Sequence, residues 1–321
     1  MFNRPLWLIL AVNILLVFGQ VNLFASENRY GSLAHYIMAL YYDGSGQLDR
    51  AVKEYKEAIR IEKDNSLIHL NFAVTLLKKN KIRESREELQ LSAQFDPESV
   101  EPHLLLVLLN LLQGEISSAA REYEIALKNA SRINPKNIEI YKSLGEFYLA
   151  RKDALKAKDI YKFLCELAPN DPQAHFLLGV AYGELKEYVL CEKAIRKSLE
   201  LKPDYAQALN HLGYTLVENN RNLREAERLI KKAIKLEPNN GAYLDSLGWL
   251  YYKRGRLKDS QKLLERAIEV FPDPVIFDHL GDLFLKAGNK QQAVINWKES
   301  LKLDPGQETV RKKIEGVKIN E

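Results

Sequence analysis

The chain has 321 residues, of which 46% are hydrophobic and 28% charged, a composition typical of soluble globular proteins. Its formal net charge is only +4 at pH 7. It therefore lacks the excess of basic residues that marks many nucleic-acid-binding proteins, and we expect no nucleic-acid partner. The two cysteines, Cys165 and Cys191, form no C-x-x-C pair, which argues against a disulfide framework or a structural zinc site.

Residues 1–25 have the parts of a secretory signal. One positive side chain is followed by an apolar run over 6–18 and a small-residue exit at Ala25. Two interpretations stay open. Cleavage after Ala25 is disfavoured by Leu23, where a small residue is preferred, whereas retention as an anchor is disfavoured because the run is shorter than the roughly 20 residues of a transmembrane helix. We expect an exported protein, periplasmic or attached to a bacterial inner membrane through residues 5–25 and facing the periplasm.

A pattern with a period of about 34 residues occupies most of the remaining chain. A leucine, a glycine and an aromatic residue recur at Leu144-Gly145-x-x-Tyr148, Leu178-Gly179-x-x-Tyr182, Leu247-Gly248-x-x-Tyr251 and Leu280-Gly281-x-x-Phe284. Most repeats end near a proline, at Pro97, Pro135, Pro169, Pro203, Pro238, Pro272 and Pro305. These landmarks divide the chain into repeats 1 to 8, at 32–65, 66–99, 100–137, 138–171, 172–205, 206–240, 241–273 and 274–307.

These residues resemble the tetratricopeptide repeat family, and the resemblance covers nearly everything from Ser32 to Gln307. It implies an all-α fold, an α-solenoid of about eight helical hairpins in a right-handed superhelix. The tail, residues 308–321, is predicted to form a capping helix with a solvated outer side. In this family the face of each first helix that the core does not use lines a concave groove for a protein or peptide partner.

The fifth repeat shows why such a unit folds as a hairpin. His175, Leu178, Gly179 and Tyr182 form one stripe of a first helix. The small residues in the repeat let the two helices approach closely, and Pro203 stops the second helix. One hairpin is too small to bury its apolar stripes, so neighbouring repeats must stack to complete the core.

Several repeats depart from the pattern. The first three carry Ala39, Ala73 and Val107 where later repeats have glycine. The third holds four extra residues around 129–132, the sixth holds one extra near Asn220, and the seventh is one residue short. We expect these changes to lengthen a helix or a loop without breaking the stack.

A ladder of histidines invites a metal hypothesis, because His35, His69 and His103 are 34 residues apart and His175 occupies the same slot. Equivalent helices should lie about 8–10 Å apart, too far for imidazoles that must each reach zinc at about 2.0–2.1 Å. We therefore predict core packing and no metal. The sequence also contains no nucleophile elbow, P-loop or G-x-G-x-x-G motif, so we expect neither an enzyme nor a cofactor.

The groove positions implied by the resemblance fall into two sets. Repeats 1 to 3 offer apolar residues: Tyr36, Leu40, Leu70, Val74, Leu77, Leu104 and Leu108. Repeats 6 to 8 offer acidic and aromatic residues that could clamp a segment of a partner: Asn210, Tyr214, Asp245, Trp249, Tyr252, Asp278 and Asp282. Two alternatives stay open: the apolar set is covered by other parts of the chain, or Trp249 packs against a neighbouring repeat.

The predicted function is a protein-binding scaffold in bacterial envelope assembly, secretion or polysaccharide export. The alternative is a non-catalytic subunit of an envelope enzyme complex. Both rest on analogy at the level of the fold.

Overall fold

The computed structural model describes residues 26–317, which form seventeen α-helices and no strand. This confirms the all-α prediction and the expected count of two helices per repeat plus one at the C-terminal end. The predicted signal or anchor at 1–25 lies outside the described residues, as does the end of the tail, residues 318–321. No helix within 26–317 is long and apolar enough to cross a lipid bilayer.

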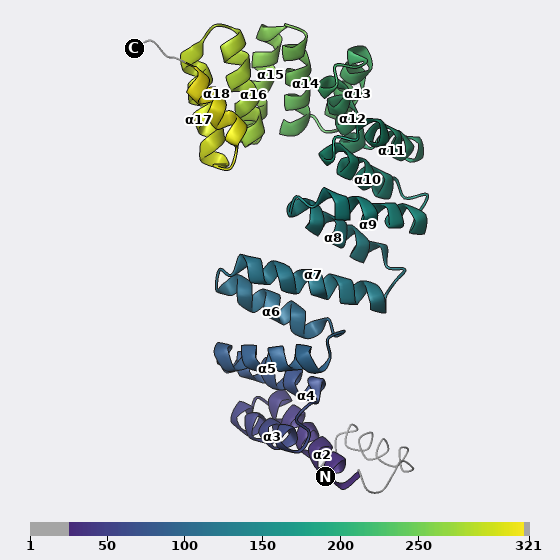
Figure 1. Ribbon diagram of the computed structural model, residues 1–321, viewed down its shortest axis with the longest axis vertical. Coiled ribbons are helices and arrows are strands. Elements are labelled where there is room, and N and C mark those ends of the chain that lie inside the picture. Colours follow the sequence, from purple (N-terminus) through teal and green to yellow (C-terminus); the bar gives the residue numbers. More distant parts are fainter. Residues whose placement is uncertain (1–25, 318–321) are drawn as a thin grey trace, which may run out of the picture. The chain divides into compact units, whose positions relative to one another are not determined.

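The helices group into two compact modules that divide after Pro135. The N-terminal module holds repeats 1 to 3, in which each hairpin packs against the next (Figure 1). Its helices are α2 (Ser26–Gly44), α3 (Leu48–Ile61), α4 (Ser66–Lys78), α5 (Ile82–Phe95), α6 (Glu101–Leu112) and α7 (Ile116–Ile133).

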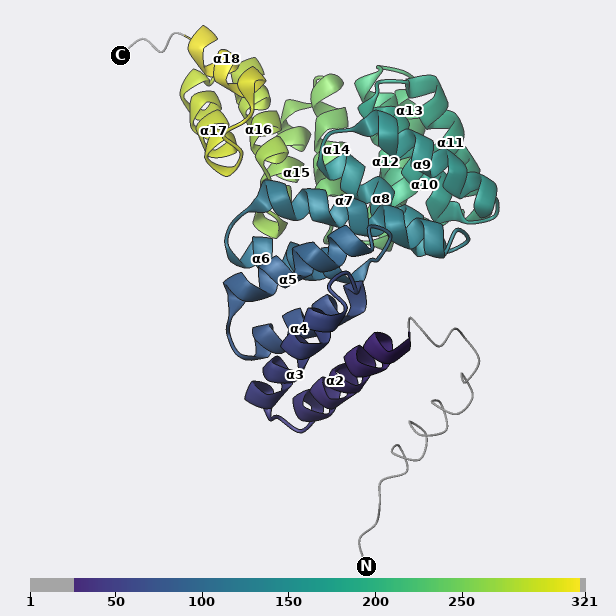
Figure 2. The same ribbon diagram turned by 60° about the horizontal axis from the view of Figure 1, so that its bottom comes forward.

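The C-terminal module holds repeats 4 to 8 and the last helix, which packs on α17 (Figure 2). Its helices are α8 (Ile138–Ala150), α9 (Ala154–Leu167), α10 (Pro172–Glu184), α11 (Tyr188–Leu201), α12 (Ala206–Glu218), α13 (Leu223–Leu236), α14 (Gly241–Lys253), α15 (Leu257–Val270), α16 (Pro274–Lys286), α17 (Lys290–Leu303) and α18 (Glu308–Gly316).

One contact recurs inside the hairpins of the C-terminal module. The glycine of each first helix faces a large side chain of the second helix sixteen or seventeen residues later, and a Cβ built on the glycine would collide with that side chain. The pairs are Gly145 with Tyr161, Gly179 with Ile195, Gly213 with Ile230, Gly248 with Leu264, and Gly281 with Trp297. The bare glycine surface therefore lets the large side chain bury itself completely between the two helices.

The turn inside each hairpin uses a left-handed residue at one fixed place, seven residues after the glycine or its substitute. Four repeats use glycine there, two use asparagine and two use lysine: Gly46, Asn80, Gly114, Lys152, Lys186, Asn220, Gly255 and Gly288. Glycine adopts this conformation without steric cost, and asparagine tolerates it better than most residues. The extra residue of repeat 6 adds a second left-handed residue, Asn222, directly before α13.

The four extra residues of repeat 3 extend a helix, as expected. Helix α7 has 18 residues, whereas every other second helix has 14. Asn129 lies in this extension with 3% of its surface exposed. Its side-chain amide donates hydrogen bonds to the carbonyl oxygens of Pro97 (2.8 Å) and Ser99 (3.0 Å), which anchors the longer helix on the preceding loop.

The glycine contact leads to a stability prediction. Gly281→Ala should lower the free energy of unfolding by about 1–3 kcal/mol, because the new methyl group overlaps the buried indole of Trp297. Gly44→Ala is the matched control, since nothing lies within 4 Å of a Cβ at Gly44. Urea denaturation followed by circular dichroism measures both variants. Equal stability of Gly281→Ala and the wild type would contradict the proposed role of this contact.

Candidate partner-binding surfaces

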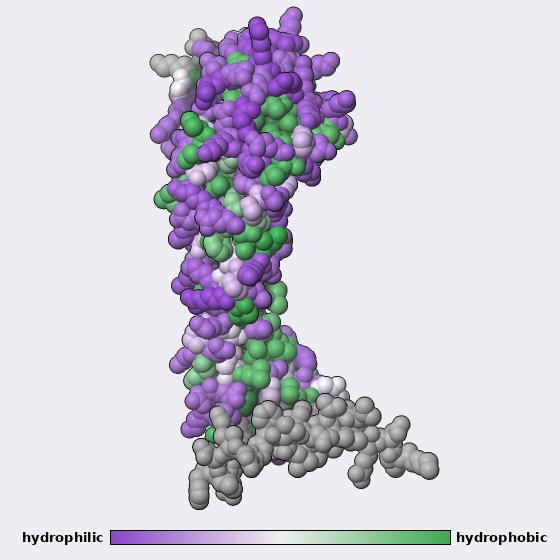
Figure 3. All heavy atoms as spheres, turned by 90° about the vertical axis from the view of Figure 1, so that its right-hand side faces the viewer, coloured by the Kyte–Doolittle hydropathy of each residue, from purple (hydrophilic) through white to green (hydrophobic). Residues whose placement is uncertain are grey.

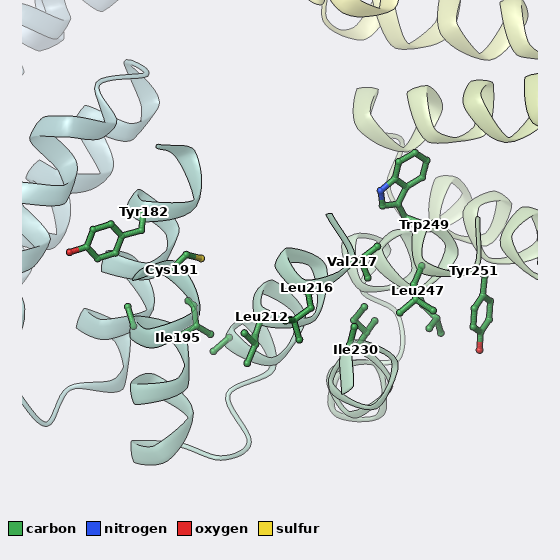
Figure 4. Packing of buried hydrophobic residues seen from close by; sticks show 14 residues of the cluster. Tyr182, Cys191, Ile195, Leu212, Leu216, Val217, Ile230, Leu247, Trp249 and Tyr251 are labelled. Atoms are coloured by element: carbon green, nitrogen blue, oxygen red, sulfur yellow. The ribbon is translucent and has the colours of Figure 1, made fainter. Parts of the chain in front are cut away.

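Trp249 lies at the centre of a stacked aromatic cluster in the C-terminal module. Its ring is nearly parallel to that of Tyr252 (centroids 4.5 Å apart, 8° between planes) and to that of His279 (4.0 Å, 13°). Its indole Nε1 donates a hydrogen bond of 2.6 Å to Oε1 of Glu218 on α12. Trp249 thus joins three consecutive repeats, and Figure 4 shows its indole leaving α14 in a different direction from Tyr251.

The acidic residues beside this cluster already have partners. Oδ1 of Asp245 lies 2.7 Å from Nδ1 of His279. The ammonium group of Lys313, on α18, lies 2.7 Å from carboxylate oxygens of both Asp278 and Asp282. The negative charge predicted for this half of the groove is therefore partly compensated within the chain, by one lysine shared between two carboxylates.

These contacts correct the expectation of an open acidic and aromatic surface. Asp245 is 6% exposed and Trp249 is 7% exposed, so the alternative in which Trp249 packs against a neighbouring repeat describes this structure. Burial raises the pKa of the Tyr214 hydroxyl, and the nearby carboxylates of Glu218 and Asp245 add to the effect. Partner binding by this set stays a prediction, and it would require these contacts to open.

Asn210 and Tyr252 are also partly buried. The side-chain oxygen of Asn210 is buried without a hydrogen-bond partner. The ammonium group of Lys286 lies 4.3 Å from the ring centroid of Tyr252. Asp245 and His279 are 34 residues apart, one more than the length of repeat 7, and this spacing gave no sign that the two side chains would meet.

The apolar set of the N-terminal module contrasts with this arrangement. Leu40, Leu104 and Leu108 are 40%, 45% and 49% exposed, whereas Tyr36, Leu70, Val74 and Leu77 are half-buried. In the space-filling view of Figure 3, apolar residues of this module form patches on the face shown. The sequence analysis missed further exposed members of the same surface: Leu33, Leu67, Leu111 and Leu112.

The histidine ladder forms a series of ion-pair contacts within its hairpins. Nδ1 of His35, His69 and His103 lies 2.6, 2.6 and 2.7 Å from the carboxylate of a glutamate nineteen residues later, namely Glu54, Glu88 and Glu122. Core packing is correct for His69 and His103, which are 2% and 7% exposed, but the His35 side chain is 38% exposed. Among residues 26–317 no group of side chains is arranged to hold a metal ion.

The cysteines occupy second-helix positions. Cys191 is fully buried on α11 and Cys165 is partly buried on α9, and the structure has both as free thiols. Burial raises the pKa of the Cys165 thiol to about 11 and also raises that of Cys191. Neither thiol has the character of an activated nucleophile.

Two family models match the chain. One, described as the C-terminal domain of cilia and flagella-associated protein 70, matches residues 99–315. The other, described as a tetratricopeptide repeat, matches residues 44–106. The chain belongs to the tetratricopeptide repeat (TPR) family. The solenoid of helical hairpins predicted from the sequence is thereby confirmed.

Individual TPR relatives share limited parts of the chain. A TPR repeat-containing protein of Pseudomonas aeruginosa is 32% identical over 114 residues, 36% of this chain and 19% of the relative. The human protein O-mannosyl-transferase TMTC3 is 26% identical over 183 residues, 53% of this chain and 20% of that protein. The chain thus spans only about a fifth of these curated relatives.

A solved structure supports the fold over a larger part of the chain. The crystal structure of a tetratricopeptide repeat protein from Parabacteroides merdae superimposes with a TM-score of 0.61 at 18% identity. It covers 78% of this chain and 97% of the matched one.

The buried aromatic cluster leads to a prediction about stability. Trp249→Ala should lower the free energy of unfolding by about 3 kcal/mol or more, because it removes the stacking on Tyr252 and His279 and leaves a cavity. Trp249→Phe keeps an aromatic ring and should cost markedly less. Thermal denaturation followed by circular dichroism measures both. An unchanged midpoint for Trp249→Ala would show that the cluster contributes nothing to folding.

The His69–Glu88 pair leads to a prediction about pH. Burial lowers the pKa of His69, but hydrogen bonds to Glu88 and to the Lys63 carbonyl outweigh burial, and the net pKa is raised. Stability from protonated His69 is therefore fully present below its unfolded pKa of about 6.5 and is lost as the pH rises through the folded pKa. Glu88→Gln should cost about 1 kcal/mol more at pH 5.5–6 than at pH 8.

The exposed pair of repeat 1 supplies the control. Glu54→Gln removes the same contact from His35, whose side chain is 38% exposed, so solvent screens the interaction and its loss should cost less than that of the buried pair. Urea titrations across the pH range measure both variants. An equal cost of Glu88→Gln at low and high pH would contradict the prediction.

Proposed function

We propose that this TPR protein is a non-catalytic scaffold that binds a segment of another protein on the first-helix face of its repeats. The observation that carries the proposal is the set of large apolar side chains left in solvent at equivalent places in the repeats, Leu33 and Leu67 in repeats 1 and 2 (42% and 53% exposed) and Leu40 and Leu108 in repeats 1 and 3 (40% and 49%). Contiguous exposed apolar surface is typical of protein-binding sites. The burial of Trp249 and Asp245 supports the choice of the N-terminal module for the binding face.

We further propose that the protein works in a bacterial cell envelope, in assembly, secretion or polysaccharide export. It would be exported, and either periplasmic or attached to the inner membrane through residues 5–25. The support is the signal-like composition of residues 1–25 together with the similarity to a TPR protein of Pseudomonas aeruginosa. The first of these observations is independent of the folded repeats.

A second candidate is a non-catalytic subunit of an envelope enzyme complex. The similarity to part of TMTC3 favours it, because there the matching segment belongs to a protein named for an enzymatic activity. Stable co-purification with one membrane enzyme would favour this candidate over a scaffold that binds an isolated segment.

Site-specific photo-crosslinking in the native host tests the scaffold. A photoreactive residue at Leu108 of the full chain should crosslink to a partner protein, whereas one at Val189 on α11, 71% exposed, should not. Crosslinks at Val189 alone would move the binding site away from the apolar face. The absence of a partner at both positions would refute the scaffold.

Cell fractionation followed by mass spectrometry of the chain tests the proposed location. Mass spectrometry should find an N-terminus at Ser26 in the periplasmic fraction or an intact N-terminus in the inner-membrane fraction. Recovery of an intact chain solely from the cytosol would refute the envelope proposal.

A further inference from the structure

An open pocket of about 590 Å³ lies at the N-terminal ends of α4 and α6. Its apolar part consists of Leu67, Leu70 and Phe95, of which Leu67 is 53% exposed and Phe95 36%. The carboxylates that line it are Glu62, Asp64, Asp96 and Glu101, and its lining contains no lysine or arginine. Such a pocket combines an apolar surface with concentrated negative charge.

The carboxylates of this pocket lack compensating cations. Within residues 26–317 none of the four forms an ion pair with a lysine or arginine. Glu62 and Asp96 cap the C-terminal ends of α3 and α5, where the helix dipole already favours a positive charge. The negative potential of these two side chains adds to that of the C-terminal ends of α3 and α5, whereas the N-terminal ends of α4 and α6 oppose it.

A comparable carboxylate in the C-terminal module shows the difference. Glu227 lies 2.7 Å from the ammonium group of Lys231 and 2.5 Å from the guanidinium group of Arg254. These contacts, with the hydroxyl of Tyr251, hold the pKa of Glu227 near 2 despite some burial. The pocket on α4 and α6 has the same kind of acid without the internal cations.

The pocket continues into the apolar face of the N-terminal module. Leu67, Leu70, Val74 and Leu77 follow one another at helical spacing along α4, as do Leu104, Leu108 and Leu111 along α6. Leu70 and Leu77 of α4 pack against the cluster that contains Leu106 and Leu109 of α6, so both helices contribute to one apolar cluster. At the other end of α4, Lys78 is 2.5 Å from Asp43, so that carboxylate has a cationic partner.

We propose that the N-terminal module binds an amphipathic helical segment whose apolar side chains pack on α4 and α6 and whose lysine or arginine residues enter the pocket of Glu62, Asp64, Asp96 and Glu101. The inference rests on the proposed scaffold function and names the chemistry of its partner. Two neighbouring rows of leucines at helical spacing suit the packing of a third helix. Charge complementarity fixes its direction along the rows.

Synthetic peptides serve as the probe. A helical peptide of about 20 residues, roughly 30 Å long, carries leucines along one face and three lysines in one terminal turn. A matched peptide replaces the lysines with glutamates. Fluorescence anisotropy with the full chain should show at least about tenfold tighter binding of the lysine peptide at low salt, and this advantage should shrink as salt screens the charges.

Variants of the full chain separate the contribution of apolar packing to peptide affinity from that of charge attraction. Leu104→Gln with Leu108→Gln should weaken the lysine peptide about tenfold or more at both low and high salt. Glu62→Gln with Asp96→Asn should weaken it mainly at low salt. Val189→Gln with Leu190→Gln, on exposed residues of α11, is the control and should change nothing. Circular dichroism verifies that each variant is folded.

Several outcomes would overturn the inference. These are no binding of the lysine peptide, equal binding of both peptides, or full affinity in the folded Leu104→Gln, Leu108→Gln variant. It also fails if the Leu104→Gln, Leu108→Gln variant still binds the peptide but no longer binds phosphatidylcholine vesicles. The same holds if that variant still binds the peptide but a dimer of the chain dissociates. If the natural partner is crosslinked in cells while the lysine peptide does not bind, this inference fails and the scaffold function stands.

Discussion

The close approach of the two helices in each hairpin is the constraint on which the rest of the structure depends. In repeats 4 to 8 a glycine of the first helix accepts a large side chain of the second, and no Cβ fits between them. Repeats 1 and 2 use alanine at this place, and Ala39 and Ala73 are fully buried. Because a hairpin cannot bury its apolar side chains alone, this contact and the stacking of neighbours must form together.

The fixed hairpin geometry decides which side chains meet. On neighbouring first helices, a side chain reaches the residue one position beyond its own equivalent, so Asp245 reaches His279 and Asp43 reaches Lys78. Residues nineteen apart face each other within a hairpin, which produces the three histidine–glutamate contacts of the N-terminal module. The same scaffold therefore supports a polar network in one module and an exposed apolar face in the other.

The two modules differ in how many of their predicted groove side chains have partners within the chain. Around Trp249 the aromatic rings stack on one another, and Lys313 forms ion pairs with both Asp278 and Asp282. On α4 and α6, leucines and carboxylates remain without such partners in the described part of the chain. Binding a partner at the second surface requires no internal contact to break, which lowers the free-energy cost of recognition there.

The sequence by itself determined the fold class, the eight repeats and the number of helices, because glycine, small residues and proline at a 34-residue period leave few alternatives to stacked hairpins. It also located the four extra residues of repeat 3, and the structure decided that they lengthen a helix and not a loop. Only the tertiary structure decided that Trp249 and Asp245 are buried while Leu104 and Leu108 are exposed. The periodic pattern places all four on the same face of a first helix, but exposure depends on side chains contributed by neighbouring repeats, such as Glu218 and His279. The acidic pocket was not predicted from the sequence for the same reason, since its residues come from two inter-repeat loops and from three helices.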